Sequence, residues 1–223
     1  MAEEYREARR EHGALTAAVE RKLLVWIAER LPRSINSDHL TVVGLLAFLL
    51  GGISYTLVPR SPQWLHAVNA CLVVNWLGDS LDGTVARVRN RLRPRYGFYV
   101  DHMVDAVATL FLLTGLAFSG LVTPWTAIAL LVAYYLLTIN MGFATHALGV
   151  FKISFGILGG TELRILLALV NLAVLAKPRF SWDGHGVLVF DVIALAATAG
   201  VAFTALRSAA QVTKRLYDME RLD

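Results

Sequence analysis

The sequence predicts an all-α integral membrane protein in which six transmembrane helices follow an amphipathic helix in the membrane interface. The first observation behind this fold class is composition: of 223 residues, 56% are hydrophobic and 17% are charged, with a mean hydropathy of +0.55. Charged residues make up about a quarter of ordinary soluble domains. The second is that the apolar residues gather in long runs separated by short basic segments, which is typical of a polytopic membrane protein.

No repeat, low-complexity tract or linker divides the chain, so we expect one membrane domain over residues 1–223. The single cysteine, Cys71, excludes an intramolecular disulfide and lies in an apolar run, where it suits a small buried hydrophobe. The net charge of +4 comes largely from arginines outside the apolar runs. Such clusters favour membrane lipids or phosphate-bearing ligands as partners, and we expect no nucleic acid.

Residues 8–33 are expected to form the interfacial helix. Its apolar side chains recur at spacings of three and four, and its charged side chains fall mostly on the rest of the helical wheel. These charged residues are Arg9, Arg10, Glu20, Arg21 and Glu29. Because charges of both signs interrupt the short apolar run, the segment does not resemble a cleaved signal. A helix that packs on a partner protein remains an alternative.

Six apolar segments over residues 39–211 then approach the length of about 20 residues that a helix needs to cross the hydrocarbon core. We expect spans at 39–57, 63–87, 97–119, 124–146, 162–177 and 187–211. Pro62 and Pro124 stand near the starts of two of them, where a missing backbone N–H is tolerated. The fifth span is the shortest.

The distribution of basic residues predicts the orientation of the chain. An even number of spans leaves both termini on one side, which also carries the loop with Arg89, Arg91, Arg93 and Arg95. The opposite side has only Arg60, Lys177 and Arg179 in its short loops. By the positive-inside rule, the termini and the arginine loop face the cytoplasm, and the cytoplasmic membrane is the expected location.

Four aspartates flank this arginine loop at the ends of the second and third spans. Asp79 and Asp82 share one helix face with Gly83, Ala86 and Arg87, and Asp101 and Asp105 are four residues apart on the next helix. A short loop should make the two helices antiparallel neighbours, so the four carboxylates can converge. Unpaired charges in a partly dry site are costly, and clustered carboxylate oxygens suit two hard divalent ions such as Mg²⁺ or Mn²⁺.

The small residues of this segment and Arg87 point to a phosphate ligand. Gly83, Ala86 and Gly97 allow a backbone or a flat ligand to approach closely, and Arg87 can clamp a phosphate. His102 points about 100° around the helix from Asp101 and is a weak candidate ligand. Metals, a clamp and close approach together indicate a pyrophosphate site.

These residues resemble the signature of the CDP-alcohol phosphotransferase family of integral membrane phospholipid-synthesis enzymes. The match covers eight fixed positions: Asp79-x2-Asp82-Gly83-x2-Ala86-Arg87-x9-Gly97-x3-Asp101-x3-Asp105. The resemblance implies a fold of six spans with a cytoplasmic active site and an N-terminal interfacial helix, and it implies a homodimer. The implied reaction is attack of a hydroxyl on the phosphate of a CDP-alcohol, with release of CMP.

The resemblance also implies a role for each matched residue. Asp79, Asp82, Asp101 and Asp105 are similar to the ligands of a binuclear metal site, and Asp105 resembles the proposed general base. Gly83, Ala86, Arg87 and Gly97 resemble the residues around the cytidine diphosphate. The Asn36, Leu40 and Thr41 positions resemble a family pattern at the start of the first span, and Asn36 as a simple helix N-cap is at least as good an explanation.

The transferred alcohol is left open by the sequence. Residues 155–162, FGILGGTE, together with His146, resemble a stretch of choline and ethanolamine phosphotransferases, which join CDP-choline or CDP-ethanolamine to diacylglycerol. The short six-span plan favours CDP-diacylglycerol as donor instead, and Thr161 with Glu162 could simply begin a helix.

The candidate acceptor or headgroup contacts are His146, Lys152, Glu162 and Arg164, with Arg207 as a further cation. Lys152, Arg164 and Arg207 could equally be lipid anchors. Asp191 is expected to be structural. A non-catalytic cation-binding scaffold or pathway is the alternative from another functional class, and the Gly83-x2-Ala86-Arg87 pattern argues against it because such a protein needs no phosphate clamp.

Overall fold

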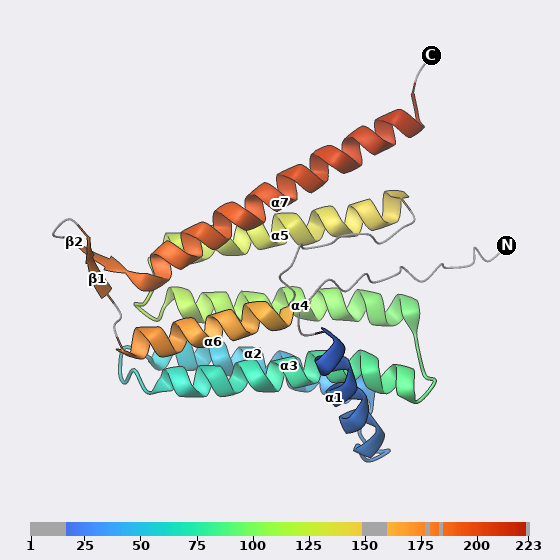
Figure 1. Ribbon diagram of the computed structural model, residues 1–223, viewed down its shortest axis with the longest axis horizontal. Helices are drawn as coiled ribbons and strands as arrows, with labels where there is room; N and C mark the ends of the chain where they lie inside the picture. Colours follow the sequence, from blue (N-terminus) through green and yellow to red (C-terminus); the bar gives the residue numbers. More distant parts are fainter. Residues whose placement is uncertain (1–16, 149–159, 177–178, 183–184, 222–223) are drawn as a thin grey trace.

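The computed structural model describes residues 17–148, 160–176, 179–182 and 185–221, which form seven helices and one short hairpin (Figure 1). The helices are α1 (Ala17–Arg30), α2 (Ser37–Leu57), α3 (Trp64–Val88), α4 (Pro94–Ala117), α5 (Pro124–Leu148), α6 (Gly160–Ala176) and α7 (Val189–Met219). The strands β1 (Arg179–Trp182) and β2 (His185–Leu188) pair antiparallel between α6 and α7. The all-α prediction is confirmed, apart from this hairpin.

Local signals explain where these helices begin. The side chain of Asn36 accepts a hydrogen bond from the backbone of His39 at 2.9 Å, and the His39 ring bonds back to the backbone N–H of Asn36, which forms a reciprocal capping box on α2. α4 and α5 begin at Pro94 and Pro124, where a proline costs no helical hydrogen bond. Of the two interpretations of Asn36, the helix N-cap is therefore confirmed.

The predicted count of six spans is not confirmed. Within the described residues, α2, α4, α5 and α7 are long and apolar enough to cross a membrane, which indicates an integral membrane protein. α6 has only 17 residues, and the 25-residue α3 carries the polar side chains of His66, Asn69 and Asn75 as well as two aspartates. The two asparagines and the two aspartates also form polar contacts with neighbouring helices.

The N-terminal helix ends before residue 33, the predicted end of the range 8–33. It ends at Arg30, while residues 8–16 lie outside the described part of the chain. A guanidinium nitrogen of Arg89 donates to the carbonyl oxygens of Leu31 at 2.9 Å and Pro32 at 3.1 Å, just past the helix end. The basic loop after α3 thus ties down the C-terminus of α1, where a cation is favoured by the helix dipole.

α2 is the central helix of the bundle, because it packs on both α3 and α4. α3 and α4 have few close backbone contacts with each other, and α2 packs on both of them. α6 packs on α3, and α5 and α7 form a pair that diverges from the other helices toward the C-terminus (Figure 1). The site predicted on α3 and α4 is therefore built around α2.

Two pairs of glycines let α2 approach its neighbours at backbone distance. A Cβ atom on Gly78 of α3 would lie 2.8 Å from the backbone nitrogen of Gly44, and one on Gly115 of α4 would lie 2.1 Å from the carbonyl oxygen of Gly52. Side chains cannot fit in these contacts, so small residues set the helix separation. The bundle core also contains the buried Tyr55, whose hydroxyl donates to Asn171 at 2.9 Å.

Candidate active site

The motif aspartates of α3 and α4 converge, as the sequence predicts. Asp79, Asp101 and Asp105 each offer a carboxylate oxygen, and these oxygens lie within 4.8 Å of one another. All three side chains are half-buried. Their spacing on two helices places the carboxylates on facing sides of a narrow gap, with α2 supporting both helices from one side. Oxygen donors in such a set suit a hard divalent cation.

Asp82 borders the same cavity but belongs less closely to the cluster. Its carboxylate accepts a hydrogen bond of 2.6 Å from the hydroxyl of Thr41 on α2, and that hydroxyl also lies 3.1 Å from the backbone oxygen of Ser37. The cavity has a volume of about 10 Å³, room for roughly one water molecule. It is lined by Thr41, Gly44, Leu45, Asn75, Asp79, Asp82, Asp101, Val104 and Asp105.

The guanidinium group that neutralises part of this acidic cluster comes from α6. Arg164 donates from Nη2 to Asp79 at 2.8 Å and from Nε to the side-chain oxygen of Asn75 at 2.7 Å. Its side chain is only 16% exposed, and the guanidinium lies 5.8 Å from the ring centroid of Phe48. The Arg164 side chain therefore lies in the site, and a lipid anchor at the bundle surface is the wrong interpretation for it.

Asn75 joins three helices at this point. Its side-chain nitrogen donates to the carbonyl oxygen of Gly44 at 3.0 Å while its oxygen accepts from Arg164, and the residue is 3% exposed. The sequence prediction missed Asn75, although it lies four residues before Asp79 and hence on the same face of α3. The spacing of four residues between Asn75 and Asp79 could have identified Asn75 as part of the site. Its contact with Arg164 of α6 could not be predicted from the sequence.

The predicted nucleotide-binding residues lie on the exposed side of the same two helices. Gly83, Arg87 and Gly97 are exposed and Ala86 is half-buried. Within the described part of the chain, a Cβ atom on Gly83 or Gly97 would meet no heavy atom within 4 Å. Close backbone approach between helices occurs instead at Gly52, Gly78 and Gly115. The space at Gly83 and Gly97 is open to a ligand.

The other predicted contacts are dispersed. His146 is exposed near the end of α5, Glu162 is half-buried in the first turn of α6, and Arg207 is exposed on α7. Lys152 and residues 155–159 lie outside the described part of the chain. Asp191 accepts from the backbone N–H and the hydroxyl of Thr123, both at 2.7 Å, so it links the start of α5 to α7 in a structural role.

Comparison with known protein families identifies the family of this chain. The sequence profile of the CDP-alcohol phosphatidyltransferase family matches residues 35–206, well over half of the chain. The chain belongs to this family. A search of curated proteins finds no match.

CDP-alcohol phosphatidyltransferases transfer a phosphate group from a CDP-alcohol to an alcohol in phospholipid synthesis, and the family generally depends on divalent cations. The matched segment begins just before α2 and contains every helix that borders the acidic cavity. The match does not include α1.

Proposed function

We propose that this protein is a metal-dependent transferase that moves a phosphatidyl group from CDP-diacylglycerol to the hydroxyl of an acceptor alcohol and releases CMP. The observation that carries the proposal is the convergence of motif aspartates from α3 and α4 on one cavity, within a chain of this transferase family. A non-catalytic cation-binding protein would need the carboxylates alone, and it would have no use for the open, arginine-flanked helix end beside them.

We assign a pair of Mg²⁺ or Mn²⁺ ions to these carboxylates. Asp79, Asp101 and Asp105 offer oxygens within 4.8 Å of one another, and Asp82 is within the same cavity lining. Arg164 pairs with Asp79, and two divalent ions would nearly balance the charge of four carboxylates. When bound, such ions stabilise negative charge on the attacking and leaving oxygens of a phosphoryl transfer.

The remaining steps are assigned to side chains of this chain. Asp105 takes the proton of the acceptor hydroxyl as that oxygen bonds to the β-phosphorus of the donor, the phosphorus that bears the diacylglycerol. The bond from this phosphorus to the oxygen shared with CMP breaks, and CMP leaves with the electron pair. Arg87, Gly83, Ala86 and Gly97 hold the cytidine diphosphate, since their helix ends are open to a ligand.

Arg164 is assigned to the acceptor side of the site. Its guanidinium lies beside Asp79, so a phosphate on the acceptor could contact a cation without leaving the cavity mouth. His146 is exposed and Glu162 is half-buried, and both stay candidates from the sequence. Lys152 stays a candidate from the sequence.

The orientation and the assembly are also part of the proposal. The arginine loop between α3 and α4 lies at the same helix ends as the aspartates, which by the positive-inside rule favours a site and termini on the cytoplasmic face of the cytoplasmic membrane. Arg89 and Arg93 also have structural partners, in the segment after α1 and at Asp38. A homodimer is expected by resemblance to the family.

The test is metal-dependent CMP release by the purified protein. We expect CMP from CDP-diacylglycerol with an acceptor from a panel of polar alcohols and their phosphates, and product mass identifies the pair. Asp105→Asn should abolish release, whereas Asp218→Asn, an exposed carboxylate of α7, should not change it.

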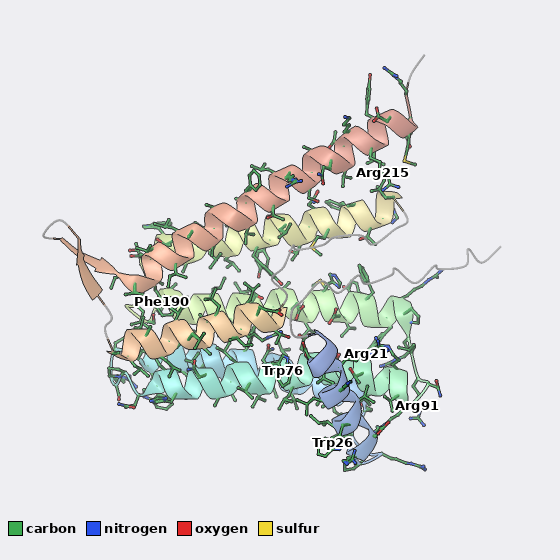
Figure 2. All side chains as sticks on the ribbon, in the orientation of Figure 1. Arg21, Trp26, Trp76, Arg91, Phe190 and Arg215 are labelled. Atoms are coloured by element: carbon green, nitrogen blue, oxygen red, sulfur yellow. The ribbon has the colours of Figure 1, made fainter. Side chains whose placement is uncertain are left out.

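Arg87→Ala should raise the KM for the donor at least tenfold, as the loss of a charged phosphate contact implies, and should leave Mn²⁺ affinity unchanged. Arg91→Ala, in the exposed loop after α3, is the matched control (Figure 2). A fully active Asp105→Asn protein would refute the mechanism. CMP release from CDP-choline or CDP-ethanolamine with diacylglycerol would replace the proposed substrates, and metal binding without turnover of any donor would favour the cation-binding alternative.

A further inference from the structure

A hydrogen-bonded cluster outside the acidic site joins three helices through Glu20 of α1. One carboxylate oxygen of Glu20 accepts from the indole N–H of Trp76 at 3.0 Å, from the hydroxyl of Thr161 at 3.0 Å and from the hydroxyl of Ser80 at 3.3 Å. The Trp76 indole also lies 3.2 Å from the Thr161 hydroxyl. Trp76 lies where α1 crosses α3 (Figure 2). We call these four residues the Glu20 cluster.

The inward position of Glu20 contradicts its predicted place on the polar face of the N-terminal helix. Glu20, Leu24 and Ala28 are spaced by four residues and so share one face of α1. Leu24 and Ala28 pack in one buried cluster with Leu81 and Val85 of α3. Because the apolar face of α1 rests on α3, the carboxylate one turn earlier is carried onto α3 as well.

The Glu20 cluster lies directly behind the network that holds Arg164. Trp76 follows Asn75 and Ser80 follows Asp79 along α3, so each donor is the chain neighbour of a partner of Arg164. Thr161 lies three residues before Arg164, which puts it about one turn earlier on α6. The same two helices are therefore linked twice, once through Glu20 and once through Arg164.

The contact matters because α6 is fixed to α3 near its other end by separate bonds. Asn69 of α3 donates to the carbonyl oxygen of Ala168 at 3.2 Å and accepts from Asn171 at 2.7 Å. At the end of α6 beside the acidic site, Thr161 bonds to α1 and α3, and Arg164 bonds to α3. Loss of the Thr161 contact would weaken the attachment of the turn from which Arg164 reaches the acidic site.

We propose that Glu20 is a positioning residue: it holds the first turn of α6 against α3 and thereby aims Arg164 at Asn75 and Asp79. Its catalytic consequence rests on the proposed function, because Arg164 is assigned there to the acceptor. The structural consequence is independent of the proposed function, because it concerns the side-chain geometry of Arg164 in the purified protein with no substrate present.

The kinetic experiment compares Glu20→Ala, Glu20→Gln and Glu29→Ala. Glu29 is an exposed carboxylate of the same helix and serves as the control. Glu20→Ala removes the acceptor and should lower kcat/KM for the acceptor alcohol about tenfold to a hundredfold, the usual scale for a misplaced substrate contact. Glu20→Gln keeps a side-chain oxygen for the three donors and should restore most of the loss.

A double substitution separates positioning from general weakening. If Glu20 acts through Arg164, then Glu20→Ala added to Arg164→Ala should cost little further activity, because contacts in one network are not additive. Fully additive losses, or wild-type kinetics in Glu20→Ala, would overturn the proposal. The KM for the donor should change less than the KM for the acceptor in the single Glu20→Ala variant.

A spectroscopic readout keeps the inference testable without turnover. In protein labelled with ¹⁵N at arginine and tryptophan, the Arg164 Nε–H and Trp76 indole signals are assigned by Arg164→Lys and Trp76→Phe. Glu20→Ala should shift both signals and speed the exchange of the Arg164 Nε–H with solvent, while Glu29→Ala leaves them in place. Shifted signals in a protein that never releases CMP would defeat the proposed function alone. An unmoved Arg164 signal in Glu20→Ala would defeat this inference alone.

Discussion

Gly115→Ala tests whether backbone contact between α2 and α4 sets the geometry of the bundle. A Cβ atom at this position would lie 2.1 Å from the carbonyl oxygen of Gly52 and 2.5 Å from its Cα, whereas real Cβ contacts are essentially never below 3.0 Å. The atoms that it meets are backbone atoms, so no side chain can rotate away. The two helices must separate by about 1 Å, and densely packed interiors transmit such a shift.

The expected cost follows from overpacking. Inserting one carbon into a well-packed contact costs about 1–3 kcal/mol, and the upper end applies here because both partners are backbone. For a chain of this size, about 3 kcal/mol corresponds to a fall in the unfolding midpoint of roughly 6–12 °C. The helix propensity of alanine returns at most about 1 kcal/mol.

Thermal unfolding in detergent, followed by the loss of monodisperse protein on size exclusion, measures this shift. Gly142→Ala on α5 is the matched control, since a Cβ atom there meets no heavy atom within 4 Å. We expect that control to unfold at the wild-type temperature or slightly above it. A Gly115→Ala protein as stable as Gly142→Ala would refute the close contact of α2 with α4.

Two further predictions concern hydrogen bonds that the sequence does not reveal. Asn171→Leu removes the acceptor of the buried Tyr55 hydroxyl and the donor to Asn69, and should cost about 1–3 kcal/mol of stability in the same thermal assay. Leu172→Ala, on the exposed face of α6, should cost less. Equal unfolding midpoints for the two variants would contradict the role of these bonds. Thr41→Val removes the hydroxyl that holds Asp82 and should weaken Mn²⁺ binding about tenfold, as loss of an outer hydrogen-bond partner does, while Thr41→Ser retains the affinity. Unchanged Mn²⁺ affinity in Thr41→Val, measured by electron paramagnetic resonance, would show that Asp82 needs no support.

Patterns within single helices were predictable from the sequence. The spacing of Asp79 and Asp82 on one helix and of Asp101 and Asp105 on the next fixes which carboxylates share a face, and the structure bears out their convergence on one cavity. Long apolar runs predict helices in the same direct way. Asn36 and Pro124 marked two helix starts correctly, because capping and proline effects are local.

Contacts between distant segments were not predictable, because one sequence contains no signal that pairs them. Arg164 and Asp79 are 85 residues apart. From the sequence alone, Arg164 could be a lipid anchor and Asp79 a metal ligand, and nothing indicates that the two form an ion pair. The packing of α2 on both α3 and α4 was likewise not predicted from the short loop that joins α3 to α4. Glu20 was misplaced because helical periodicity defines faces without stating which face is buried.

The arrangement of the site shows how a membrane protein can keep several carboxylates close together. Repulsion among Asp79, Asp101 and Asp105 would push α3 and α4 apart, and these helices have little direct contact to resist it. α2 holds both helices in place, because Gly78 on α3 and Gly115 on α4 both pack on the backbone of α2. Among the described residues, no buried side-chain nitrogen or oxygen lacks a hydrogen-bond partner.

Arg164 then differs from the rest of the frame in one respect. The frame of α2, α3 and α4 is fixed by backbone contacts, whereas Arg164 reaches the cluster from the first turns of α6 through side-chain bonds alone. A ligand that competes for Asp79 would displace a side chain without moving a helix. Glu20 limits that freedom from behind by holding Thr161, so α1 contributes to the active site through the orientation of one guanidinium.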